Sequence, residues 1–153
     1  MQSVNNFKIF LVDDDKMFLK SLEHNVCKFF PNVKIKTFLT GEECLSNLSE
    51  PPDAIVLDYF LPGINGLSTF KQIKESFPKM PIILLSNNKE EKTIQRLIAE
   101  GVYEYIIKTR YCINGLKLSL GNIIDRKNNT NMENAYNENN DYILFFQDIG
   151  GES

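Results

Sequence analysis

The sequence predicts an α/β fold in which five helices cover both faces of one doubly wound, five-stranded parallel sheet. Short apolar runs alternate along the chain with stretches whose apolar residues recur at helical spacing. The runs IFLV, AIVL and PIILL are nearly continuous, which is typical of parallel strands buried on both faces. The length of 153 residues suits one domain of ordinary size.

The expected strands follow from the apolar runs, and the expected helices from the helical spacing between them. The strands cover residues 7–12, 33–38, 53–58, 81–86 and 104–108. The helices cover residues 15–30, 41–49, 67–77, 89–100 and 114–126. Apolar and charged residues alternate in the second strand, which is therefore expected to be a half-buried strand at the edge of the sheet.

Local signals set the ends of these helices. Asp15 is the expected N-cap of the first helix, and Thr40, with Glu43 three residues later, predicts a capping box at the start of the second. Proline ends the first three helices. Gly101 is the expected C-terminal cap of helix 89–100.

The C-terminal tail differs in composition from the rest of the chain. Residues 1–127, the expected domain, contain every Lys and Arg, whereas residues 128–153 contain five acidic residues and no basic one. Seven of residues 128–141 are Asn and none is Val, Ile, Leu or Phe, so this stretch is expected to be disordered or a linker. The apolar segment 142–146 is either a strand or turn, the start of a further region, or a segment that docks on a partner or on the domain itself.

The composition argues against several classes of protein. With 42% hydrophobic and 24% charged residues, the chain is typical of a soluble protein. It contains neither an apolar run of membrane-spanning length nor a signal peptide, so a cytoplasmic location away from membranes is expected. Neither part of the chain has the strong basic excess of a nucleic-acid binder. One histidine and three widely spaced cysteines argue against a zinc site or a histidine-based triad.

Charged and hydroxyl side chains stand at the carboxyl ends of four expected strands. Asp13 and Asp14 follow the first strand, Asp58 ends the third, and Ser86 and Lys108 end the fourth and fifth. The carboxyl edge of a parallel sheet is where such folds bind ligands, so these side chains are expected to meet there. Crowded carboxylates repel one another and need a cation. Ligand sets made only of oxygen suit Mg²⁺, which favours phosphate as a partner.

This set of groups matches the requirements of phosphoryl transfer, which depends on positioning and charge neutralisation. Asp58 is the candidate nucleophile, which would form an aspartyl-phosphate. Lys108 and Ser86 are candidate partners of the phosphate oxygens. Taken alone, Asp13 and Asp14 fit a polar turn before a helix equally well, and the groups on the other three strand ends favour the site.

These residues resemble the receiver domain of two-component response regulators, over about residues 7–127. The resemblance rests on LVDDD, VLDYFLPGING around Asp58, LLS at Ser86, and GVYEYIIK, which ends at Lys108. It implies the flavodoxin-like strand order 2-1-3-4-5. It also implies that Asp58 is phosphorylated by a histidine kinase or a phosphotransfer protein, with Mg²⁺ as the cofactor.

The resemblance also implies a role for each residue of the metal site. Asp14 is a direct Mg²⁺ ligand, and Asp13 acts through a water molecule. Asp58 is both a metal ligand and the phosphoacceptor. The backbone carbonyl of Phe60 is a further ligand.

The family resemblance assigns two roles to the remaining groups: contact with the phosphate, and a conformational switch. Lys108, the Ser86 hydroxyl and the backbone amide of Asn87 contact the phosphoryl group, and Tyr105 moves inward on activation. The switch surface, formed by helix 89–100, strand 104–108 and helix 114–126, then changes shape. An output partner or a second copy of the chain would read this surface, so a homodimer is plausible there.

Three bulky or unusual residues surround the expected site. Thr109 follows Lys108, where the family has Pro on a cis bond; a cis bond before Thr costs roughly 3 kcal/mol, so a trans bond and a reshaped loop are expected. Asn87 stands where the family usually has a small residue, and its bulkier side chain is expected to narrow access to the phosphorylated site. Phe60 would shield the phosphate from water, which predicts slow spontaneous dephosphorylation.

Two other functions fit part of the pattern. A receiver-like interaction module that is never phosphorylated is disfavoured, because such modules lose an acid or the lysine. This chain keeps all five groups of the site: Asp13, Asp14, Asp58, Ser86 and Lys108. A phosphohydrolase with an Asp nucleophile, of the haloacid-dehalogenase type, is suggested by the spacing of Asp13 and Asp15. Met17 stands where that class has Thr, however, and the chain is too short for a cap domain. Without a nucleotide-binding motif, the chain is not expected to take phosphate directly from ATP. The resemblance implies a signalling switch that catalyses only its own phosphorylation and slow dephosphorylation, and not an enzyme.

Overall fold

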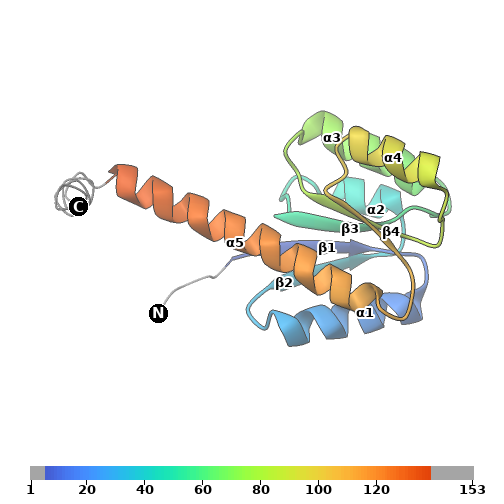
Figure 1. Ribbon diagram of the computed structural model, residues 1–153, viewed down its shortest axis with the longest axis horizontal. Helices are drawn as coiled ribbons and strands as arrows, with labels where there is room; N and C mark the ends of the chain where they lie inside the picture. The colour runs from blue at the N-terminus through green and yellow to red at the C-terminus, as the bar shows by residue number, and fades with distance from the viewer. Residues whose placement is uncertain (1–5, 139–153) are drawn as a thin grey trace. The chain divides into compact units, whose positions relative to one another are not determined.

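The computed structural model describes residues 6–138 and contains the predicted parallel sheet with helices on both faces (Figure 1). The strands are β1 (Lys8–Val12), β2 (Lys34–Phe38), β3 (Ala54–Asp58), β4 (Ile82–Ser86) and β5 (Glu104–Ile107). The helices are α1 (Lys16–Phe29), α2 (Gly41–Ser46), α3 (Gly66–Ser76), α4 (Glu91–Ala99) and α5 (Cys112–Glu138). Apart from the end of α5, the elements lie within a few residues of the predicted ones.

The sheet has the order β2-β1-β3-β4-β5, with every pair parallel, and this confirms the predicted topology. The register sets the height of each strand end. Val12 of β1 lies opposite Leu57 of β3, so the residues that follow them, Asp13 and Asp58, lie at the same level of the sheet. Ser86 of β4 lies opposite Ile107 of β5, which brings Lys108 to the same edge.

Helices α2, α3 and α4 cover one face of the sheet, and α1 together with the first turns of α5 covers the other (Figure 1). All five residues of both β3 and β4 are buried, as expected for central parallel strands. On the α2–α4 side, Phe10, Ile55 and Phe70 belong to one contiguous core. Burying a side chain of this size contributes about 1.5–3 kcal/mol, so this core fixes the strands whose ends form the site.

The predicted helix ends are confirmed by their hydrogen bonds. Asp15 Oδ1 accepts the backbone N–H groups of Met17 and Phe18 at 3.0 and 3.1 Å. Thr40 Oγ1 accepts the N–H of Glu43 at 3.1 Å, which confirms the N-cap. The Glu43 carboxylate accepts the N–H of Leu39 at 3.3 Å, so the reciprocal bond of the predicted capping box reaches the residue before Thr40. Gly101 follows α4 with a φ of +102°, a left-handed conformation that glycine adopts without steric cost.

Charged side chains line the exposed edges of the sheet. β2 forms one edge, and its Lys34 and Lys36 are exposed while Phe38 is buried, which confirms the predicted half-buried edge strand. β5 forms the other edge, where Glu104 is exposed.

The end of α5 differs from the prediction. The helix continues to Glu138, through most of the Asn-rich stretch that was expected to be disordered or a linker. A helix that has already formed adds one hydrogen bond for each residue it gains and pays no new nucleation cost, so weak helix formers can extend it. The apolar segment 142–146 lies outside the described residues, and the division into a domain over 1–127 and a tail over 128–153 stays a prediction. None of the helices within residues 6–138 has the length and apolar character to cross a membrane.

Candidate functional site

The carboxyl ends of β1 and β3 bring three carboxylates together. Oxygen atoms of Asp13, Asp14 and Asp58 all lie within 4.8 Å of one another. Asp13 and Asp58 are buried, at 2% and 5% exposure, whereas Asp14 is exposed. The acid cluster, as we call these three residues, is therefore embedded in the sheet edge on one side and open to solvent at Asp14.

One ammonium group faces the acid cluster from β5. Lys108 Nζ lies 2.8 Å from Asp13 Oδ2 and 3.3 Å from Asp58 Oδ2. Burial pushes the pKa of Lys108 down, but the hydrogen bond to Asp13 and the charges of Asp58 and Asp13 outweigh it, so the pKa lies above its ordinary value. The lysine therefore stays charged and partly neutralises the cluster.

The environment of Asp58 disfavours its ionised form. Burial, and next the charge of Asp13, raise the pKa of Asp58 to about 6, although Lys108 and the N–H of Phe60, which donates to Asp58 Oδ1 at 3.1 Å, act in the opposite direction. Three carboxylates facing one ammonium leave a net negative charge at neutral pH. A divalent cation would neutralise this charge, and an all-oxygen donor set fits Mg²⁺.

The start of α3 approaches the backbone of Asp58 closely. A Cβ atom on Gly66 would overlap the backbone carbonyl of Asp58, so only glycine allows this close approach. The N–H of Ile64 donates to Glu42 Oε1 of α2 at 2.9 Å, which ties the loop between β3 and α3 to its neighbour. Phe60 is 54% exposed, and its ring packs edge-on against Tyr59 with centroids 5.0 Å apart. A bulky exposed ring thus stands two residues after Asp58.

Ser86 and Tyr105 both hydrogen-bond to Asn88, a residue that no sequence motif singled out. The buried Ser86 hydroxyl accepts the N–H of Asn88 at 3.0 Å, and the Tyr105 hydroxyl donates to the Asn88 carbonyl at 2.8 Å. Asn88 Oδ1 in turn accepts the N–H of Glu90 ahead of α4. An Asn shortly before a helix is a recognisable turn signal, but its contact with Tyr105 depends on long-range folding. Asn87 lies between Ser86 and Asn88 and is exposed.

The segment after β5 places Lys108 without a cis bond, because every peptide bond within residues 6–138 is trans. The N–H of Lys108 donates to the carbonyl of Ser86 at 2.8 Å. The N–H of Thr109 donates to the carbonyl of Ile107 at 2.8 Å, and Thr109 Oγ1 accepts the N–H of Tyr111 at 3.1 Å. The loop that was expected to be trans therefore still delivers the ammonium to the acids.

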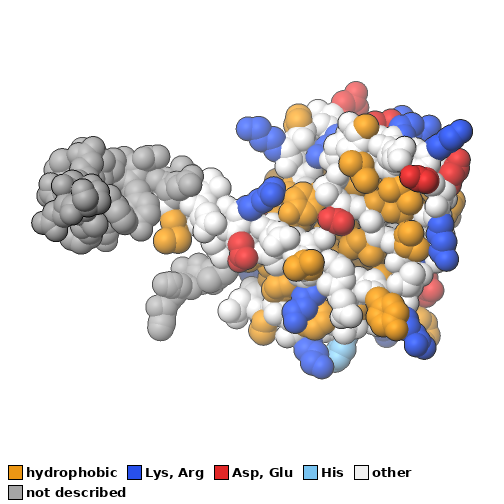
Figure 2. Space-filling model, in the orientation of Figure 1, with side chains coloured by type: hydrophobic (Ala, Val, Ile, Leu, Met, Phe, Trp, Pro, Cys, Tyr) orange, Lys and Arg blue, Asp and Glu red, His pale blue; other side chains and the backbone are white. Residues whose placement is uncertain are grey.

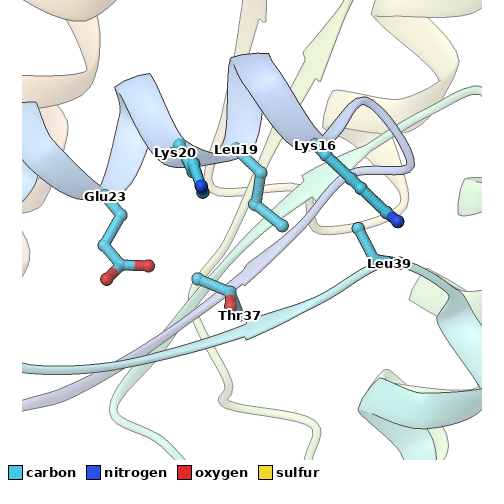
Figure 3. A pocket seen from close by; sticks show the side chains of 6 residues that line it. All are labelled: Lys16, Leu19, Lys20, Glu23, Thr37 and Leu39. Carbon is cyan, nitrogen blue, oxygen red and sulfur yellow. The ribbon is translucent and has the colours of Figure 1, made fainter.

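A groove between α1 and β2 is separate from these groups (Figure 3). Its lining combines apolar and charged side chains: Lys16, Leu19, Lys20, Glu23, Thr37 and Leu39. It contains no residue of the acid cluster. On the face shown in Figure 2, basic and acidic side chains are interspersed and form no single basic patch.

Three carboxylates that could hold a metal ion thus lie beside an ammonium at the carboxyl edge of a doubly wound sheet, where such folds bind their ligands. The response regulator receiver domain family matches residues 9–112, and the chain belongs to that family. This membership assigns the chain to two-component signal transduction.

Two curated relatives and one solved structure illustrate the similarity. The probable C4-dicarboxylate response regulator DctR of Halalkalibacterium halodurans is 35% identical over 102 residues, which cover 66% of this chain and 44% of DctR. The DNA-binding transcriptional regulator NtrC of Salmonella typhimurium is 30% identical over 101 residues, or 65% of this chain and 21% of NtrC. The crystal structure of DrrB, a Thermotoga maritima OmpR/PhoB homolog, superposes with a TM-score of 0.70 at 30% identity and covers 79% of this chain and 54% of DrrB. The chain thus spans less than half the length of these curated relatives.

Proposed function

We propose that this chain is a phosphorylatable receiver in which Asp58 accepts a phosphoryl group from a histidine kinase or a phosphotransfer protein in a Mg²⁺-dependent reaction. The observation that carries the proposal is a cluster of three carboxylates at the sheet edge, two of which pair with one nearly buried ammonium. Membership of the receiver family supports the same assignment.

The residues present fit a bound Mg²⁺. Asp14 and Asp58 would hold it directly, Asp13 through water, and Phe60 through its backbone carbonyl; the ion would supply charge neutralisation during transfer. An Asp58 carboxylate oxygen attacks the phosphorus atom of the donor phosphohistidine. The bond between phosphorus and the imidazole nitrogen breaks, and its electron pair leaves with the imidazole. The product is an aspartyl-phosphate.

Three other groups of the chain contact the phosphoryl group once it is on Asp58. The Lys108 ammonium, which pairs with Asp13 and Asp58 at rest, moves to a phosphate oxygen. The Ser86 hydroxyl, which accepts the Asn88 N–H at rest, rotates to donate to the phosphate. The backbone amide of Asn87 donates to the same group.

The link from Ser86 through Asn88 to Tyr105 passes this change to the surface. When the Ser86 hydroxyl turns to the phosphate, it releases the Asn88 N–H, and the Asn88 carbonyl that holds the Tyr105 hydroxyl shifts with it. Tyr105, whose ring already packs against the core, then repacks further inward, and the surface of α4, β5 and α5 changes shape. An output partner, or a second copy of the chain in a homodimer, reads this surface.

Incubation with Mg²⁺ and acetyl phosphate tests the proposal by intact mass. We expect one added phosphoryl group on the native chain and none with EDTA or on Asp58→Asn. Asp53→Asn is the matched control. Asp53 directly precedes β3, at the end of the strand away from the acid cluster, and its Oδ2 accepts the N–H of Lys8. The substitution should leave the adduct unchanged. Absence of an adduct on the native chain under all conditions would favour an interaction module that works without phosphorylation.

Replacing Phe60 by serine is expected to shorten the lifetime of the aspartyl-phosphate about 3- to 10-fold. Phe60 lies two residues after Asp58, its backbone N–H bonds to that carboxylate and its ring is half exposed, so removal of the ring would open a path for the attacking water. The measurement is loss of the phosphoryl adduct with time after removal of the donor. Leu118→Ser removes an exposed apolar side chain of α5 and should not alter the lifetime. An equal lifetime for Phe60→Ser and the native chain would contradict shielding by Phe60.

A further inference from the structure

The Lys108 ammonium has a third neighbour besides the two carboxylates. It lies 4.5 Å from the centroid of the Phe18 ring, over the ring face. The Lys108 side chain is only 14% exposed, so the ring covers the ammonium where the acids leave it open. A cation over a ring face is attracted by the ring quadrupole, and the attraction grows when water is excluded.

The position of Phe18 is set by the start of α1. Its backbone N–H donates to Asp15 Oδ1 at 3.1 Å, and the next residue, Leu19, donates to the Asp15 carbonyl at 2.9 Å and is buried. The ring therefore projects from the first turn of a capped helix whose inner side is anchored in the core. Asp15, the third residue of the acidic run, caps this helix and is not one of the three carboxylates of the acid cluster.

The main chain at Lys108 does not by itself fix the ammonium. The N–H of Lys108 is held by the Ser86 carbonyl, but a flexible four-carbon stem separates the backbone from Nζ. During the proposed transfer the ammonium must also leave Asp13 and reach a phosphate oxygen on Asp58. The face of an aromatic ring attracts a cation without a directional hydrogen bond, so it can hold the ammonium at both positions.

We propose that Phe18 is a positioning residue, which keeps the Lys108 ammonium at the acid cluster and supports it most when its bond to Asp13 breaks on the way to the phosphoryl group. This inference rests on the proposed phosphorylation of Asp58. It adds a contact from α1 to a site otherwise built from the ends of the strands.

Phe18→Leu tests the inference because it keeps an apolar side chain and removes the ring face. The rate of phosphorylation by acetyl phosphate at saturating Mg²⁺ is expected to fall about 3- to 10-fold, in line with a cation–π contribution on the order of 1 kcal/mol. The donor concentration that gives half the maximal rate should not change, because Phe18 does not touch the donor. Phe18→Tyr keeps the ring and should restore most of the rate.

Phe29→Leu is the matched control. It removes a second ring of α1, over which Lys117 Nζ lies at 4.7 Å from the centroid, remote from the acid cluster in the chain and at the other end of the helix. Its rate should equal that of the native chain. If Phe18 acts through Lys108, then Phe18→Leu should have no further effect in a Lys108→Ala background. A fall of the same size in that background, or a native rate for Phe18→Leu, would overturn the inference.

A second readout separates this inference from the proposed function. If the native chain accepts no phosphoryl group, the proposed function fails, and urea unfolding of Phe18→Leu, Lys108→Ala and the double variant still reports on the contact. Non-additive changes in unfolding midpoint support a direct interaction between Phe18 and Lys108. Additive changes refute it.

Discussion

Lys108→Ala is expected to destabilise the metal-free protein by about 2–3 kcal/mol at a pH of about 7.5, somewhat below the usual loss from breaking a fully buried ion pair because Asp14 opens the site to solvent. The substitution leaves Asp13 and Asp58 buried and facing each other with no cation between them. Saturating Mg²⁺ should restore most of the loss, because a bound cation takes over the neutralising role of the ammonium. The measurement is urea unfolding in EDTA and in Mg²⁺.

The loss of stability caused by Lys108→Ala is expected to grow as the pH rises. Without Lys108 the folded-state pKa of Asp58 lies above the value of about 6 that it has in the native chain, and the ordinary value is 3.8. A carboxyl whose pKa is raised by folding loses its favourable contribution as the pH rises through the folded-state pKa. The penalty of Lys108→Ala should therefore be small at a pH of about 4 and complete above a pH of about 7.

Lys74→Ala is the control for Lys108→Ala. Lys74 is also a partly buried lysine, whose Nζ donates to the carbonyls of Met80 and Pro78 at 2.7 and 3.3 Å, outside the acid cluster. Its removal should destabilise the fold to a degree that is the same with EDTA and with Mg²⁺. If Mg²⁺ rescues both variants equally, the ion acts elsewhere and the explanation for Lys108 is wrong.

Asp58→Asn is expected to have the opposite effect, a gain of about 1–2 kcal/mol in the free energy of unfolding in EDTA at neutral pH. A rise in pKa from 3.8 to about 6 corresponds to an upper limit of about 3 kcal/mol of penalty for the ionised form. Asparagine removes the charge and keeps an oxygen for the N–H of Phe60. The gain should disappear as the pH falls below about 4, where the native carboxyl is protonated in both states.

Mg²⁺ should reverse the order of stability of these two proteins. The native chain binds the ion and gains stability with its concentration, whereas Asp58→Asn lacks one ligand and gains less. Thermal unfolding across a Mg²⁺ titration measures this crossing. Asp53→Asn, outside the acid cluster, should show the Mg²⁺ response of the native chain. If the native protein is more stable than Asp58→Asn in EDTA at neutral pH, then the ionised Asp58 carboxylate does not destabilise the fold and the prediction is wrong.

The sheet order was implied by the family resemblance, whereas the meeting of Asp13, Asp14, Asp58 and Lys108 at one edge was predictable from local patterns. Apolar runs identify the strands, and residues at the carboxyl ends of parallel strands share one edge, so Asp13, Asp58 and Lys108 had to converge. Capping by Asp15 and Thr40 was predictable for the same reason, since a cap involves residues only three apart.

Contacts between segments far apart in the sequence were not predictable in this way. Asn88 bridges Ser86 and Tyr105, and Phe18 covers Lys108, which is 90 positions away in the chain. No periodicity specifies which aromatic side chain will face which cation. The extent of α5 was also missed, because its Asn-rich residues are weak helix formers individually and become helical by extending a helix that has already begun.

The charged edges of the sheet have a consequence for how copies of the chain meet at high concentration. A neighbour that extended the sheet at β2 would have to lay its backbone beside Lys34 and Lys36, and at β5 beside Glu104. Charged side chains at such positions disfavour edge-to-edge addition and the fibrous aggregates that grow from it. The edge strands are thus protected against irreversible polymerisation, and the helices are left as the surfaces for reversible association.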